Sequence, residues 1–159
     1  MQSLDPARIT RGLDIAVVGL GYVGLPLALA LARHHRVIGF DIHEERIRSL
    51  SAGIDTTGES SPEELAAEGI RFTSDSSDIR QPTVFIIAVP TPVDSEKLPD
   101  LGPLLSACRM VGQVLKSGDL VVFESTVYPG ATEEECVPML SDASGLVFNR
   151  DYFVGYSPE

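Results

Sequence analysis

Three glycines and one aspartate, placed around two apolar runs, are the residues of this chain best suited to chemistry. The glycines have the spacing G-x-G-x-x-G at Gly19, Gly21 and Gly24 and follow an apolar, β-branched run. Such a turn leads into a helix whose first N–H groups can face a pyrophosphate. Asp41 ends the next apolar run, where a carboxylate can accept a hydrogen bond from a ribose hydroxyl. The pattern predicts dinucleotide binding, with NAD favoured over NADP because Asp41 would repel a 2′-phosphate.

Each glycine has a different expected role. Gly19 permits the tight turn, Gly21 lets a pyrophosphate approach the backbone, and Gly24 lets the helix pack closely on the strand. A lone G-x-G-x-x-G is weak evidence, because glycines at a helix entry often serve backbone geometry only. Here the strand before it, the helix after it and the acid at the second strand end all agree.

Apolar runs and helical patterns alternate along the whole chain. We expect strands near 14–18, 36–40, 70–73, 83–88, 119–123 and 152–155, and helices near 22–33, 43–51, 62–68, 103–116 and 131–141. Strands separated by helices predict an α/β fold of Rossmann type, a doubly wound parallel sheet in a single domain. Residues 1–12 are expected to be a flexible leader and residues 13–159 the cofactor-binding domain.

Composition narrows the function classes. The net charge of −11 argues against a nucleic-acid partner. No apolar run approaches the roughly 20 residues of a membrane span, and the first residues lack a signal-peptide core, so we expect a cytoplasmic protein without a membrane partner. Cys108 and Cys136 each fall in a helical stretch without metal-ligand spacing, which predicts buried, reduced, structural thiols and no metal site.

Two later strand ends carry prolines and hydroxyl groups. One apolar run leads into 89–92, which reads Val-Pro-Thr-Pro, and another leads into 124–130, which reads Glu-Ser-Thr-Val-Tyr-Pro-Gly. Both are expected where the nicotinamide half of a dinucleotide would rest. The prolines fix the loops, and the hydroxyls of Thr91, Ser125 and Thr126 offer hydrogen bonds. Composition alone equally allows these to be turn residues and nothing more.

Five segments in this order resemble the nucleotide-sugar 6-dehydrogenases, a family that includes UDP-glucose and GDP-mannose dehydrogenases. They are residues 18–26, 39–41, 89–92, 124–130 and 155–159. The forms of the last two segments look like the bacterial branch that acts on UDP-N-acetylhexosamines. That branch supplies uronic acids for O-antigen and capsular polysaccharides, including the Vi type.

The resemblance assigns roles by position. It implies cofactor contacts from Gly19, Gly21, Tyr22, Val23, Gly24, Asp41, Arg46, Val89, Pro90, Thr91, Ser125 and Thr126. Thr126 also matches a threonine that helps to hold a water in the active site, and Glu159 matches the acid that works with that water in hydrolysis. Without the resemblance, Arg46 would be interpreted as a solvated helix position and Glu159 as a frayed terminal residue.

The family reaction is a double oxidation. Two NAD⁺ in turn take hydride from C6 of a UDP-sugar, and a cysteine thiolate forms a thiohemiacetal and then a thioester that water cleaves. In the family, that cysteine and its supporting lysine and asparagine lie beyond the cofactor domain, as do a dimerisation helix and a second domain. The resemblance therefore implies an excised cofactor domain that binds NAD without turnover. The fragment is expected to be a monomer and its parent a homodimer or larger.

Two other functions remain open at this level. A β-hydroxyacid-type dehydrogenase shares a Gly-Leu-Gly turn but does not explain residues 124–130, and a short-chain dehydrogenase would need Tyr-x-x-x-Lys, whereas Tyr152 is followed by Tyr156. A stand-alone NAD-binding regulatory module is the alternative that is not an enzyme. The reading frame after residue 159 would distinguish this module from the dehydrogenase.

Overall fold

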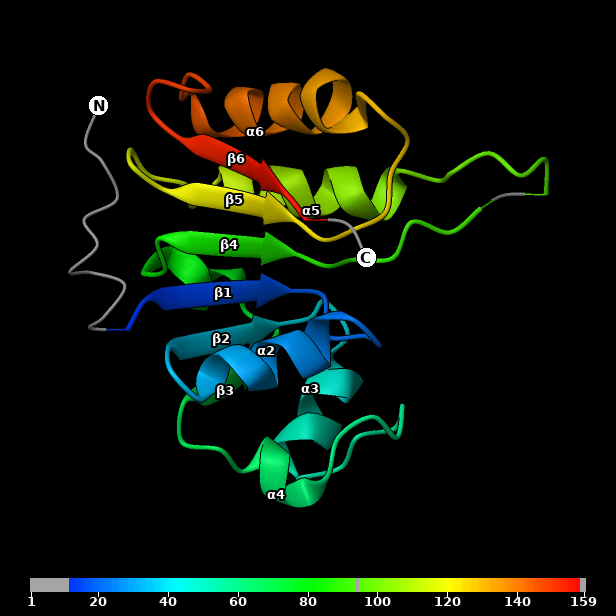
Figure 1. Cartoon of the computed structure of the whole chain (residues 1–159), viewed down its shortest axis with the longest axis vertical. Coiled ribbons are helices and arrows are strands. Elements are labelled where there is room, and N and C mark those ends of the chain that lie inside the picture. Colours follow the sequence, from blue (N-terminus) through cyan, green and yellow to red (C-terminus); the bar gives the residue numbers. More distant parts are fainter. Residues whose placement is uncertain (1–11, 94, 158–159) are drawn as a thin grey trace.

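A six-stranded parallel sheet forms the centre of the molecule (Figure 1). The computed structural model describes residues 12–93 and 95–157. The strands are β1 (Asp14–Val18), β2 (Arg36–Phe40), β3 (Ile70–Thr73), β4 (Val84–Ile87), β5 (Leu120–Phe123) and β6 (Phe153–Tyr156). Their spatial order is β3-β2-β1-β4-β5-β6, and every neighbouring pair is parallel. This is the strand order of a doubly wound dinucleotide-binding domain, which confirms the predicted α/β fold of Rossmann type.

Helices cover both faces of the sheet. They are α2 (Gly24–Ala32), α3 (Glu44–Ser51), α4 (Pro62–Leu65), α5 (Gly102–Gly112) and α6 (Val137–Ser144), together with a 3₁₀ helix η1 (Ser76–Arg80) and a π-helix η2 (Thr132–Cys136). Alternate residues of a strand face opposite sides, so Ile15 and Val17 join the cluster under α2 while Ala16 and Val18 join the cluster under α5. The strands are mainly apolar because both faces are covered, and the charged residues Asp14, Arg36 and Arg71 lie near the strand starts.

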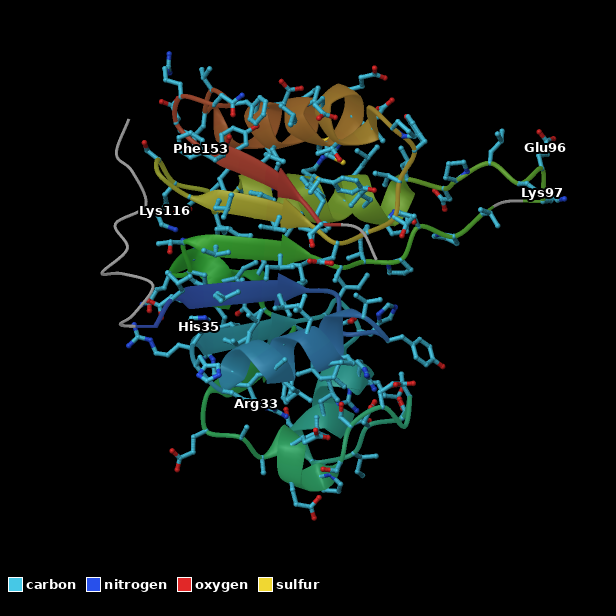
Figure 2. All side chains as sticks on the ribbon, viewed as in Figure 1. Arg33, His35, Glu96, Lys97, Lys116 and Phe153 are labelled. Carbon is cyan, nitrogen blue, oxygen red and sulfur yellow. The ribbon has the colours of Figure 1, made fainter. Side chains whose placement is uncertain are left out.

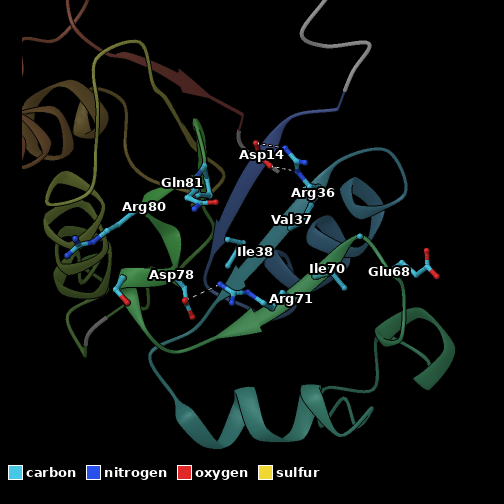
Figure 3. A pocket seen from close by; sticks show the side chains of 13 residues that line it. Asp14, Arg36, Val37, Ile38, Glu68, Ile70, Arg71, Asp78, Arg80 and Gln81 are labelled. Carbon is cyan, nitrogen blue, oxygen red and sulfur yellow. Dashed lines mark hydrogen bonds and ion pairs between the residues drawn. The ribbon is translucent and has the colours of Figure 1, made fainter.

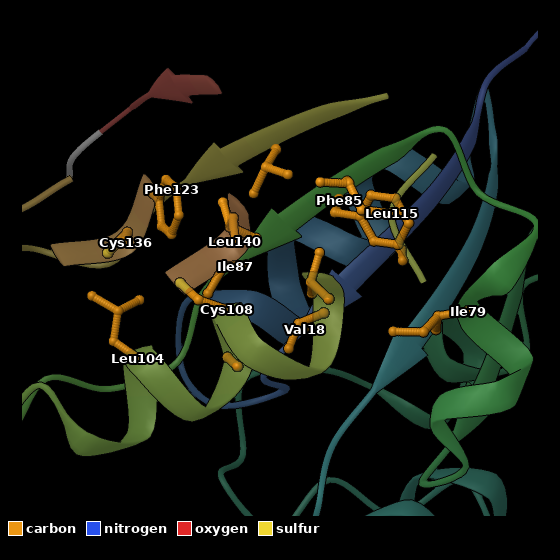
Figure 4. Close-up of a cluster of buried hydrophobic side chains, with 14 of the residues drawn as sticks. Val18, Ile79, Phe85, Ile87, Leu104, Cys108, Leu115, Phe123, Cys136 and Leu140 are labelled. Atoms are coloured by element: carbon orange, nitrogen blue, oxygen red, sulfur yellow. The ribbon is translucent and has the colours of Figure 1, made fainter. Parts of the chain in front are cut away.

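The larger apolar cluster lies between the sheet and helices α5 and α6 (Figure 4). Ile87 and Phe123 from the sheet meet Leu104 from α5 and Leu140 from α6, and all four are at most 1% exposed. This cluster fixes α5 and α6 against the sheet. The loops at the ends of β4 and β5 therefore start from well-packed strands.

The last helical region differs from the single helix expected over 131–141. A π turn at η2 precedes α6, and Pro138 lies in the first turn of α6. Proline has no N–H to donate, so it is tolerated at a helix start and not in an interior. The sequence reading also missed η1, whose first turn is capped by Asp75 accepting from the Ser77 N–H at 2.8 Å. The other expected helices occur with ends shifted by a few residues.

All six strands end on one side of the molecule, which we call the carboxyl-end rim. The loop from β4 to α5 extends outward from this rim, with Glu96 and Lys97 at its far end (Figure 2). An antiparallel bridge joins Val93 to Pro99 within this extension. His35 and Lys116 lie on the opposite side, where strands begin. Within the described ranges, no helix is both long and apolar enough to cross a membrane.

Candidate functional site

The turn between β1 and α2, residues 18–24, is the first part of the candidate site, and two of its glycines are required by the fold. Gly19 has φ +95°, a conformation that side-chain-bearing residues rarely adopt, and a Cβ there would lie 2.9 Å from the Ala88 carbonyl oxygen. A Cβ on Gly24 would collide with the Gly19 carbonyl oxygen. The expected close approach at Gly24 is therefore present, and its immediate neighbour is the backbone of the turn itself.

Gly21 is different, because the protein leaves its surroundings open. A Cβ built on Gly21 meets no atom of the described residues within 4 Å, and the residue is exposed. Its backbone lies outside the left-handed region, so the turn itself would accept a side chain. The absence of a side chain thus keeps a space free beside the backbone, as a bound pyrophosphate requires.

The start of α2 has free capacity for an anion. Among the described residues no side chain caps this helix, and its first turn has no acidic residue. Helices α3 and α4, by contrast, carry glutamates in their first turns, and α4 has a full capping box between Ser61 and Glu64. An uncapped N-terminus beside Gly21 presents N–H groups and the positive end of the helix dipole to the open space. These features fit the pyrophosphate of a dinucleotide.

Asp41 follows β2 and is fixed against the glycine turn. One carboxylate oxygen, Oδ2, accepts from the Leu20 N–H at 3.0 Å. The other, Oδ1, accepts from the His43 N–H at 3.0 Å and lies 2.8 Å from the His43 ring Nδ1. The side chain is 14% exposed. The carboxylate is therefore held in one orientation next to the turn, and Oδ2, which has a single donor among the described residues, keeps lone-pair capacity for a ribose hydroxyl.

Arg46 of α3 also reaches the glycine turn, and it is not the solvated helix residue that its sequence position alone suggested. Its Nε donates to the Leu20 carbonyl at 3.0 Å, and its Nη1 donates to Asp55 at 2.8 Å and to Thr56 at 3.1 Å. The side chain is only 11% exposed. The peptide groups of Leu20 are thus held from both sides, by Asp41 at the N–H and by Arg46 at the carbonyl.

Asp55, which sequence reasoning missed, anchors this arrangement. Its side chain is fully buried and accepts from Arg46, from the Thr57 N–H and hydroxyl, and from the N–H groups of Glu59 and Ser60. Burial alone would raise the pKa of Asp55, but the bonds from Thr57, Arg46 and Glu59 outweigh it and hold that pKa well below its usual range. The available signal was an aspartate two residues before a threonine in a loop, a common side-chain turn.

The loops after β4 and β5 are tied to each other. The Ser125 hydroxyl donates to the Val89 carbonyl at 2.6 Å, and the Thr91 hydroxyl donates to the Thr126 carbonyl at 2.7 Å. Each loop thus supplies one hydroxyl and one carbonyl. Ser125 is buried, whereas Thr126 is exposed at the carboxyl-end rim. These hydroxyls therefore fix the backbones of the two loops relative to each other.

The remaining predicted site residues take varied positions. Tyr22 is 69% exposed beside the turn, and Val23 is the residue that precedes α2. Pro90 is exposed between Val89 and Thr91. Glu159 and residues 1–11 of the expected leader 1–12 lie outside the described residues.

Both cysteines lie in the interior. Cys108 of α5 and Cys136 of η2 are fully buried, and their thiols interact with each other. The hydrogen bond with Cys136 and burial raise the pKa of the Cys108 thiol. Among the described residues, no group of histidines, cysteines and acids could hold a metal ion. Because both thiols are buried, they have no access to a substrate at the carboxyl-end rim.

A hollow of about 810 Å³ lies at the other end of the sheet (Figure 3). It is lined by the starts of β1, β2 and β3 and by η1, and two ion pairs span it, Arg36–Asp14 at 2.6 Å and Arg71–Asp78 at 3.1 Å. Ligands of open α/β sheets bind at the carboxyl ends of the strands. We therefore place the functional site at the glycine turn and not in this hollow.

The fold and the turn together define a dinucleotide-binding domain. The family described as "UDP-glucose/GDP-mannose dehydrogenase family, NAD binding domain" matches residues 13–159, and this chain belongs to that family, with NAD as its cofactor.

Curated relatives from bacteria are similar over nearly the whole chain. The UDP-N-acetyl-D-glucosamine 6-dehydrogenase of Pseudomonas aeruginosa is 55% identical over 94% of this chain and 36% of its own length. The Salmonella typhi protein of the same name is 53% identical over 91% of this chain and 34% of its own length. A GDP-mannose dehydrogenase structure from Pseudomonas aeruginosa superimposes with a TM-score of 0.84 at 32% identity, over 91% of this chain and 36% of that one. The chain spans about a third of the length of these relatives.

Proposed function

We propose that this chain is the cofactor-binding part of an enzyme that oxidises the C6 alcohol of a UDP-N-acetylhexosamine to the uronic acid with two NAD. The observation that carries the proposal is the glycine turn, where Gly21 is left open while Leu20 is held by Asp41 and Arg46. The sugar class is supported by the two bacterial 6-dehydrogenases that are 53–55% identical.

The residues of this chain would bind and orient the cofactor. The open space at Gly21 and the uncapped start of α2 would take the pyrophosphate, and Asp41 the adenosine ribose. The tied loops carrying Ser125 and Thr91 would support the nicotinamide ring. NAD supplies the hydride acceptor when bound. We further propose that Thr126 and Glu159 hold and activate the water of the hydrolytic step, as their match to the family implies.

The parent enzyme is proposed to work in the cytoplasm, where NAD and nucleotide sugars are available, and to form a homodimer or larger assembly. Its UDP-sugar would be bound mainly by segments outside this chain. The 159-residue chain alone is expected to be a monomer.

Four measurements test the proposal, two on the 159-residue chain and two on the parent enzyme. Calorimetry should show NAD binding to the 159-residue chain, and the chain with NAD and UDP-N-acetylglucosamine should produce no NADH. The parent enzyme should form two NADH for each uronic acid, and its Glu159→Gln variant should accumulate a covalent adduct visible by intact mass. Absence of NAD binding would overturn the cofactor assignment. Turnover by the chain alone would overturn the proposal that essential catalytic residues lie outside this chain. Normal turnover by Glu159→Gln would remove that residue from the mechanism.

A further inference from the structure

We propose that Asp55 determines cofactor specificity by withholding the Arg46 guanidinium from the 2′-phosphate of NADP. This inference rests on the proposed binding of NAD at the glycine turn. It assigns a function to a residue that lies outside the glycine turn and outside the two loops at the ends of β4 and β5. Asp55 acts through Arg46 and is a positioning residue, since it is itself fully buried.

The guanidinium of Arg46 has no nitrogen available to a ligand in this arrangement. Nε is bonded to the Leu20 carbonyl, and Nη1 is bonded to Asp55 and Thr56. Nη2 is enclosed by the protein without a hydrogen-bond partner among the described residues. Arginine recognises phosphate best through two parallel N–H groups of its planar fork. Arg46 cannot present such a fork while Asp55 holds it.

Hydrogen bonds from its own loop fix Asp55 in the position where it binds Arg46. Four donors besides Arg46 converge on its two oxygens, from Thr57, Glu59 and Ser60, at 2.7–3.0 Å. These bonds tie the carboxylate to its own loop, so it cannot follow Arg46 outward. An unpaired Nη2 inside the protein is costly, because buried donors are normally satisfied. The guanidinium therefore gains a partner if it is released toward a phosphate.

The charges near Leu20 also predict that NADP binds more weakly than NAD. Near Leu20 the side chains of Asp41 and Asp55 carry one negative charge each and Arg46 one positive charge, so the balance is negative. A 2′-phosphate adds further negative charge and is disfavoured. Neutralising Asp55 brings this balance to zero and also frees the fork of Arg46. Neutralising Asp41 as well leaves a net positive charge, the condition that favours NADP.

The test compares the dissociation constants of NAD and NADP in the 159-residue chain by calorimetry. Asp55→Asn should lower the ratio Kd(NADP)/Kd(NAD) by about tenfold, a change of ~1.4 kcal/mol in relative affinity. The double variant Asp41→Asn/Asp55→Asn should lower it further. Adding Arg46→Gln should remove most of the effect of Asp55→Asn, because only the loss of one negative charge then remains and no guanidinium is released. The matched control is Asp151→Asn, a loop carboxylate paired with Arg150 at the opposite end of the sheet, which should leave the ratio unchanged.

The ratio separates specificity from folding. Loss of a buried ion-pair partner can destabilise the chain, but a smaller folded fraction raises both dissociation constants by the same factor. Asp55→Ser, which keeps a short acceptor for the loop, provides a second variant if Asp55→Asn does not fold. A normal ratio in a folded variant overturns the proposal, and so does failure of both variants to fold, since Asp55 would then be structural. If the unaltered chain binds no dinucleotide, the proposed function fails instead.

Discussion

Replacing Gly21 by valine should separate cofactor binding from folding. A Cβ at this position meets no atom within 4 Å in the part of the chain that the structure describes, and the backbone needs no left-handed conformation. We therefore expect a change in unfolding free energy of at most about 0.5 kcal/mol, or a Tm shift of about 1–2 °C for a domain of this size. NAD binding should be lost, because the branched side chain occupies the space beside the turn that the pyrophosphate needs.

The size of the binding effect follows from the contacts at risk. Hydrogen bonds to a charged group contribute roughly 1.5–3 kcal/mol each, so loss of two should cost about 3 kcal/mol or more. That corresponds to a rise in Kd for NAD of at least about 150-fold. Calorimetric titration measures the affinity, and circular dichroism melting measures the stability of the same sample.

Gly24→Ala is the matched control, with the opposite expected pattern. Its Cβ would collide with the Gly19 carbonyl oxygen, so the turn must distort. Such overpacking costs about 1–3 kcal/mol, and Tm should fall by several degrees. The reasoning is refuted if Gly21→Val binds NAD as tightly as the parent chain, or if it melts as early as Gly24→Ala.

Three further outcomes follow from the same contacts. Asp41→Asn should narrow the preference for NAD over NADP, since a repulsive charge is lost while a hydrogen-bonding group remains; calorimetry that finds NADP the tighter ligand of the parent chain would contradict the prediction. Ser125→Ala should lose about 1 kcal/mol of stability, because the Val89 carbonyl loses its 2.6 Å hydrogen bond. Ser117→Ala, at the end of the sheet where strands begin, should have the melting temperature of the unaltered chain. Asp55 has a lowered pKa in the folded state, so its contribution is present above the unfolded pKa of about 3.9 and is lost as pH falls below it. Between pH 7 and pH 3, the melting temperature should fall more steeply for the unaltered 159-residue chain than for Asp55→Asn. An equal dependence of melting temperature on pH in the two proteins would refute this prediction.

Local patterns in the sequence determine much of this fold. The six expected strands occur because short β-branched runs separated by helical stretches suit a sheet covered on both faces. The glycine turn could also be predicted, since positions such as Gly19 need a conformation or a close approach that a side chain forbids. The π turn before α6 could not be predicted, because five residues are too few to distinguish the apolar spacing of a π-helix from that of an α-helix.

The environment of Arg46 shows why the site was harder to predict. On its own helix Arg46 follows two exposed glutamates, which suggests a solvated face. Its burial depends on a carboxylate nine residues later and on a carbonyl 26 residues earlier, and these meet only in the folded molecule. Tertiary contacts of this kind produce no periodic pattern in the sequence. The resemblance could therefore indicate a role for Arg46 but not the role of its partner Asp55.

The two hydroxyl–carbonyl bonds between the loops of β4 and β5 have a thermodynamic consequence. Ser125 and Thr91 each lock a backbone carbonyl of the opposite loop, so the spacing of the loops is set before any ligand arrives. Association then orders few additional torsions at this end of the cofactor, and the conformational entropy lost on binding is correspondingly small. A nicotinamide ring would meet a preorganised surface, and successive cofactor molecules would meet the same one.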